Sequence, residues 1–219
     1  MMNNLLIWLR QFLVAMPAVL LSLSFHEFAH GFVSWKLGDP TARNFGRLTL
    51  NPLKHIDPLG FICMALFHFG WAKPVPVNAR YYKKPRVGMA LTAAAGPAMN
   101  LLLGFFGMAI FKLLCLIPTK TAFMVSFMSI ALEMAWYFCL LNVGLAIFNL
   151  IPIPPLDGSR IAFIFLPSKW YFGIMRYEQY IYIGFVILLF LGVFDKTIGW
   201  LDTQVLLGFD AFWKLIFGF

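Results

Sequence analysis

The sequence predicts an all-α polytopic membrane protein: a bundle of about four to five transmembrane helices, with a small β-hairpin or sheet on the cytoplasmic side between the first and second spans. Of the 219 residues, 61% are hydrophobic and 12% are charged, whereas a soluble globular domain carries about 25% charged residues. The mean hydropathy is +0.81. No linker, low-complexity tract or repeat interrupts the apolar runs, so we expect one membrane-embedded domain over residues 1–219.

Apolar runs of sufficient length define the expected spans, because a helix needs about 20 residues to cross the hydrocarbon core. The predicted spans cover residues 12–35, 87–116, 121–150 and 177–194. A final stretch, residues 197–217, mixes polar and charged side chains with aromatic ones. This pattern suits a helix lying in the membrane interface, and a fifth span is the alternative.

Basic residues are concentrated in one loop. Residues 36–86 contain nine Lys or Arg and two Asp, whereas Arg10 alone precedes the first span. Because positively charged loops remain in the cytoplasm, we expect a multi-pass protein of the cell membrane, of the bacterial inner-membrane kind, with this loop inside. The charges flank apolar spans and form no basic stripe on a polar domain, so nucleic-acid binding is not expected.

Two parts of this loop predict short edge strands. Residues 45–50 and 74–79 alternate in character and are bounded by Gly and Pro. Pro74 and Pro76 have no backbone N–H, so Val75 and Val77 retain the donors that could pair with an incoming peptide strand.

The chemistry is indicated by His26-Glu27-Phe28-Ala29-His30, at the end of the first span. Residues four apart share a helical face, so His26 and His30 can bind one metal ion while Glu27 stands beside it as a general base. This arrangement is typical of zinc hydrolases. It places the active site toward the cytoplasm.

A catalytic zinc site uses three protein ligands and leaves a position for water. The candidates for the third ligand on the cytoplasmic side are Asp39, His55, Asp57, His68 and Asp157. Asp157 follows a proline-rich stop at the end of the third predicted span, at about the depth of the two histidines. Asp157 can equally be the N-cap of a following helix over residues 158–165, and the residues alone leave both interpretations open.

Three motifs in this order resemble the site-2 protease family of intramembrane zinc metalloproteases, peptidase family M50. They are the His26–His30 motif, the Ala95-Gly96-Pro97-Ala98-Met99-Asn100 segment and the Asn149-to-Gly158 segment. The resemblance covers about residues 22–165. It implies one catalytic Zn²⁺ bound by His26, His30 and Asp157, with Glu27 as the base. Only 25 residues precede His26, which is similar to short bacterial members without a PDZ domain.

Polar residues inside the spans are the remaining site candidates. By the resemblance, Asn100 faces the active site. Asn149 and Asn142 share a helical face, and Asn149 lies nearer the active-site depth; either can bond a substrate carbonyl or the developing oxyanion. The alternative for each Asn is a hydrogen bond between helices. Glu133, in mid-span, should be neutral, paired or in a wet cavity.

The resemblance implies an enzyme that hydrolyses peptide bonds of transmembrane proteins near the cytoplasmic face, with these substrates and the lipid bilayer as its partners. The alternative is a non-catalytic protein that binds metal or transmembrane helices in the membrane. Metal transport is disfavoured because the spans offer few polar ligands beyond the site, and the intact Glu27 disfavours a purely binding role.

Overall fold

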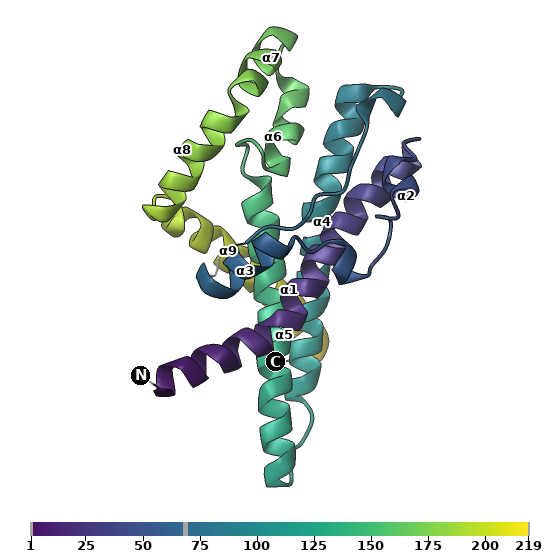
Figure 1. The fold of residues 1–219 in the computed structure, drawn as a ribbon. Coiled ribbons are helices and arrows are strands. Elements are labelled where there is room, and N and C mark those ends of the chain that lie inside the picture. The colour runs from purple at the N-terminus through teal and green to yellow at the C-terminus, as the bar shows by residue number, and fades with distance from the viewer. Residues whose placement is uncertain (1, 68–69, 219) are drawn as a thin grey trace.

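Three long helices form the body of the computed structural model, which describes residues 2–67 and 70–218. They are α1 (Met2–Lys36), α4 (Pro85–Cys115) and α5 (Ala122–Leu150), and they lie side by side in Figure 1. All three are long and apolar enough to cross a membrane. The N-terminal part of α1 leaves this bundle at an angle in Figure 1, as expected for a helix with an internal proline, Pro17.

Helices α4 and α5 pack closely because α4 presents glycines to α5. A Cβ atom added to Gly104 would lie 3.0 Å from Val143 Cγ2, and one added to Gly107 would lie 3.3 Å from Cys139 Cα. The Cys139 thiol donates a hydrogen bond to the Gly104 carbonyl (3.2 Å). Small residues of this kind let helices approach in a membrane, where lipid provides no hydrophobic drive for association.

The segment between α1 and α4 is irregular, and the predicted β-hairpin or sheet is wrong. It contains α2 (Thr41–Asn44), η1 (Pro52–Lys54), α3 (Pro58–Phe67) and η2 (Ala79–Tyr81). Within the described part of the chain there is no strand, and one isolated antiparallel bridge pairs Ile56 with Ala72. Charged side chains instead of a second strand satisfy the backbone around residues 73–78, as described below.

After α5 the chain forms short helices and then a bent pair. The short ones are α6 (Asp157–Ala162), η3 (Phe163–Phe165) and α7 (Ser168–Arg176). The bent pair is α8 (Glu178–Phe190) and α9 (Asp195–Phe217), whose axes differ by 80°.

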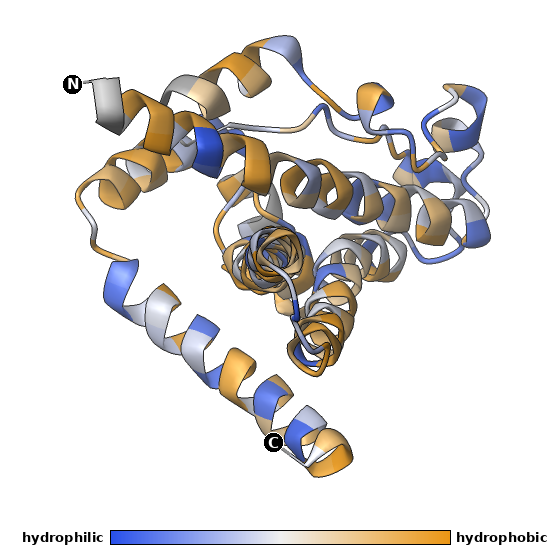
Figure 2. Ribbon diagram, turned by 90° about the horizontal axis from the view of Figure 1, so that it is seen from below, coloured by the Kyte–Doolittle hydropathy of each residue, from blue (hydrophilic) through white to orange (hydrophobic). Residues whose placement is uncertain are grey.

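The number of helices that could span alone is smaller than the predicted four to five spans. The 13 residues of α8 extend only about 20 Å at 1.5 Å per residue, less than the hydrocarbon thickness. The described chain has three helices that could span alone, or up to four spans if the bent pair counts as one. Figure 2 shows polar residues recurring along α9.

Polar contacts attach α9 to α4. Lys112 Nζ lies 2.7 Å from Asp210 Oδ1, and the Trp213 indole donates a hydrogen bond to the Phe105 carbonyl (2.8 Å). These two contacts lie about one turn apart on α9, so they fix its rotation against the bundle.

We predict that Gly104→Leu lowers thermal stability, because the new side chain would force α4 and α5 apart. The expected loss is about 1–3 kcal/mol, typical of overpacking, measured by thermal unfolding of the purified protein in detergent. The matched control is Gly184→Leu on α8, where an added Cβ meets no atom within 4 Å. Equal midpoints for the two variants would contradict the close packing.

Candidate active site

Two histidines from α1 and one aspartate from α6 converge on a single point. The Nε2 atoms of His26 and His30 lie 2.9 Å apart. Asp157 Oδ2 lies 3.2 Å from the first and 3.3 Å from the second. This is the one group of three or more possible metal ligands within ligand distance among the described residues.

The other ring nitrogen of each histidine is bound by α4. His26 Nδ1 lies 2.8 Å from Asn100 Oδ1, and His30 Nδ1 lies 2.7 Å from the Thr92 carbonyl oxygen. Because both partners are oxygen acceptors, Nδ1 carries the proton of the neutral imidazole and Nε2 keeps a free lone pair. Such outer hydrogen bonds orient metal-binding histidines in known sites.

The three atoms fit a zinc ion. Ligand atoms about 2.0–2.1 Å from a tetrahedral zinc are about 3.3 Å from one another, close to the observed 2.9–3.3 Å. Two imidazole nitrogens and one carboxylate oxygen are a donor set that catalytic zinc uses. The backbone of α4 also leaves room, since a Cβ on Gly96 would lie 2.5 Å from His30 Nε2 and 2.6 Å from His26 Nε2.

Asp157 reaches the site because the chain turns sharply after α5. Gly158 permits this turn, since a Cβ there would lie 2.1 Å from the Leu150 carbonyl oxygen. The N-cap of α6 is Leu156, and no side-chain capping bond is formed. Asp157 is instead the first residue of α6, and its carboxylate points to the histidines, so the capping alternative is wrong.

The neighbouring histidines favour an ionised Asp157. Burial raises the pKa of the carboxyl, but hydrogen bonds and charge interactions with His26 and His30, when these rings carry a second proton on Nε2, lower it more, to about 2. The group is therefore a carboxylate at neutral pH and is available as a ligand.

Glu27 lies beside the cluster and is held from one side. Its Oε2 accepts a hydrogen bond from the Val75 backbone N–H (2.8 Å). Among the described residues, Oε1 takes part in no hydrogen bond. The expectation that the Val75 N–H is available to pair with an incoming strand is therefore wrong for this conformation, whereas the expectation for Val77 stays a prediction.

The polar residues of the spans differ in their distance from the cluster. Asn100 is fully buried and contacts His26 directly. Asn149 donates to the Leu145 carbonyl on its own helix (2.9 Å), and its catalytic role stays a prediction. Asn142 links α5 to α1 by donating to Ser22 Oγ (2.8 Å). Glu133 is paired with Arg10 at 2.5 Å.

The other candidates for the third ligand are engaged elsewhere. Asp39 is buried and accepts bonds from Ser34, Thr41 and the Asn78 N–H; burial raises the pKa of its carboxyl, but these bonds lower it more, so it is ionised. His55 Nε2 donates to the Thr49 carbonyl. Asp57 accepts from the Gly60 N–H. His68 lies outside the described residues.

Several residues of the site were not predicted by sequence reasoning. Thr92 acts through its backbone carbonyl and Val75 through its backbone N–H, which no side-chain pattern reveals. Gly96 could have been found from the sequence. It lies in the Ala95-to-Asn100 segment, one helical turn before Asn100, and a small residue at this place indicates a close approach to another helix.

A helical membrane protein with a His-His-Asp metal site beside a glutamate has the features of a zinc-dependent peptidase. Residues 14–191 match peptidase family M50, and the chain belongs to this family. It is 43% identical over 171 residues to YwhC of Bacillus subtilis, described as a candidate zinc metalloprotease, with 78% of this chain and 77% of the relative covered.

More distant relatives agree with this assignment. The chain is 30% identical over 156 residues to Rip2 of Mycolicibacterium smegmatis and 29% identical over 151 residues to Rip2 of Mycobacterium tuberculosis, both also described as candidate zinc metalloproteases. In both cases the match covers 67% of this chain and 55% of the relative. No solved structure matches the chain. The family and these names identify the chain as a zinc metalloprotease.

We predict that Asp157→Ala lowers zinc affinity as well as activity, because it removes one of three ligands. The loss should exceed the 10- to 100-fold that is usual for removing an outer-sphere partner, measured by metal analysis after titration with a chelator. Asp195→Ala, which removes an exposed carboxylate at the start of α9, is the control. Unchanged affinity in Asp157→Ala would mean that another residue completes the site.

Proposed function

We propose that this metalloprotease is of the intramembrane site-2 type and hydrolyses peptide bonds of transmembrane proteins with one catalytic zinc ion. The observation that carries the proposal is the His-His-Asp cluster, whose two histidines lie with Glu27 on a helix long and apolar enough to span the bilayer. The substrates are then membrane proteins, and the lipid bilayer is the medium of the reaction.

The residues of the site have separate tasks in this reaction. His26, His30 and Asp157 would hold the zinc ion, which when bound acts as a Lewis acid and lowers the pKa of a water ligand. Glu27 accepts the proton of the attacking water and returns it to the leaving amine. The Val75 N–H holds one carboxylate oxygen, so Oε1 is available for the proton. Asn100 keeps His26 in the ligand orientation.

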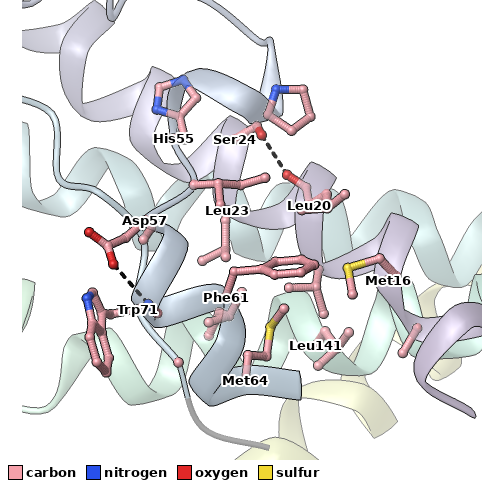
Figure 3. Close-up of a pocket in the computed structure, with 18 of the residues that line it drawn as sticks. Met16, Leu20, Leu23, Ser24, His55, Asp57, Phe61, Met64, Trp71 and Leu141 are labelled. Atoms are coloured by element: carbon pink, nitrogen blue, oxygen red, sulfur yellow. Dashed lines mark hydrogen bonds between the residues drawn. The ribbon is translucent and has the colours of Figure 1, made fainter. Parts of the chain in front are cut away.

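An apolar cavity of about 720 Å³ lies between α1, α3, α5 and α8. Figure 3 shows Phe61 and Met64 of α3 facing Leu20 and Leu23 of α1 across it. Leu23 lies one turn before the His26 motif. We propose that the cavity receives an apolar segment of the substrate.

Two polar groups of the largely apolar cavity wall are bonded within the protein. Ser24 donates its hydroxyl to the Leu20 carbonyl (2.6 Å), and Asp57 accepts from the Gly60 N–H (2.9 Å). Because these groups are already bonded within the protein, a membrane-embedded substrate segment suits the cavity better than a polar peptide.

The orientation is proposed from the charge pattern. Nine basic residues over residues 36–86, in the loop between α1 and α4 and at its two ends, favour a cytoplasmic position for this loop and for the site end of α1. A chain in the cell membrane with this orientation would cleave its substrates near the cytoplasmic face.

Glu27→Gln tests the enzymatic role. Gln keeps the shape of the side chain but cannot accept the water proton, so we expect cleavage to fall at least about 100-fold with zinc content unchanged. The assay is release of fragments from single-span reporter proteins co-expressed with the wild type, Glu27→Gln or the control Glu178→Gln. Substantial cleavage by zinc-loaded Glu27→Gln would contradict the assignment of Glu27 as the base.

Cysteine labelling tests the orientation. A variant without Cys63, Cys115 and Cys139 receives one cysteine, at Lys83 in the basic loop or at Lys120 between α4 and α5. An impermeant thiol reagent should label position 120 in intact cells and position 83 only after the cells are opened. The reverse pattern would invert the proposed topology.

A further inference from the structure

The segment over residues 73–78 lies against the face of α1 that carries Glu27. Val75 is 8% exposed, and its N–H donates to Glu27 Oε2 at 2.8 Å. Its side chain packs on the next turn of α1, where Val75 Cγ1 lies 3.3 Å from the position of a Cβ on Gly31. Val75 is therefore docked on α1 through both its backbone and its side chain.

A buried arginine holds the same segment from the other side. Arg47 is 8% exposed. Its Nη2 donates to the carbonyls of Lys73 (2.5 Å) and Pro74 (3.2 Å), and its Nη1 donates to the Lys54 carbonyl. The guanidinium thus joins three carbonyls from two parts of the loop, with a rigid fork of donors that Lys does not have.

The contacts of Arg47 and Glu27 meet in one peptide group. The Pro74 carbonyl and the Val75 N–H belong to the same planar unit, with Arg47 on its oxygen and Glu27 on its nitrogen. Because this peptide bond is trans, its C=O and N–H point in opposite directions. The peptide group therefore lies between a cation and an anion, in the orientation that both charges favour.

A second buried charge fixes the far end of the segment. Asp39, which is fully buried, accepts from the Asn78 N–H at 2.7 Å. Pro74 and Pro76 further restrict the backbone between the two anchors. The Val75 N–H is consequently part of a rigid frame, and it holds Glu27 at a defined place beside the metal ligands.

We infer that Arg47 is a positioning residue for the catalytic base, acting on Glu27 through the Pro74–Val75 peptide group. The inference rests on the proposed role of Glu27 as the base. A glutamate side chain has several rotamers, and only some would place the second carboxylate oxygen of Glu27 beside His26, His30 and Asp157. The frame built by Arg47 selects among them, which lowers the entropy that must be lost before proton transfer.

Two pairs of variants test this inference in the purified full-length protein, with a single-span reporter that the wild type cleaves. Arg47→Met removes the donors, and Arg80→Met, at an exposed arginine of the same loop, is its control. Val75→Pro removes the N–H, whereas Val75→Ala keeps it and shortens the side chain. Arg47→Met and Val75→Pro should lower kcat about tenfold, as for one lost hydrogen bond to a charged group, with KM and zinc content near wild type.

A double variant separates positioning from general stabilisation. In a Glu27→Asp background, whose shorter side chain does not reach the Val75 N–H in the same way, Arg47→Met should lower kcat by less than twofold, because the contact is already lost. Arg47→Lys, which keeps the charge without the fork, should retain part of the activity. A full tenfold loss in both backgrounds, or a parallel loss of zinc, would overturn the inference.

The remaining outcomes are also distinguishable. If Arg47→Met does not fold, the comparison of Val75→Pro with Val75→Ala decides, and equal kcat values overturn the inference. If Glu27→Gln cleaves the reporter, the proposed function fails together with the inference. If Glu27→Gln is inactive while Arg47→Met and Val75→Pro have the wild-type kcat, only the inference fails.

Discussion

The convergence of three lone pairs is the constraint on which the rest of the structure depends. His26 Nε2, His30 Nε2 and Asp157 Oδ2 lie within 3.3 Å of one another. Atoms of this kind repel one another unless a cation lies among them, and a buried carboxylate is costly without a partner. Each neighbouring element supplies something that this arrangement requires.

Helix α4 illustrates this dependence. Its backbone must approach α1 closely enough for the Thr92 carbonyl and Asn100 to reach the histidines, and Gly96 makes that approach possible. Further along the same helix, Gly104 and Gly107 provide the close contact with α5. Close packing and polar contacts are the interactions that hold helices together in lipid, and in this chain they also orient His26 and His30.

In the loop between α1 and α4, charged side chains form hydrogen bonds with the backbone. No strand pairs with its backbone over the described residues 73–78, so charged side chains take the place of a strand: Arg47 bonds carbonyls, whereas Asp39 and Glu27 bond N–H groups. Each of these charged side chains is bonded to the backbone that it organises. Glu27 is therefore both the proposed base and a support of the loop, which links the order of the loop to the geometry of the site.

The sequence by itself determined the membrane class, the pairing of His26 with His30 and the position of Glu27, because composition and a four-residue spacing on a helix are local properties. It did not decide whether the Asp157 side chain caps α6 or reaches the two histidines, since that depends on how α6 is placed against α1. It wrongly predicted strands at 45–50 and 74–79, because alternation cannot reveal that side chains occupy the ladder positions. Apolarity over 177–217 likewise could not reveal the 80° bend between α8 and α9. Only the tertiary structure decided these points, because each depends on contacts between residues far apart in the chain.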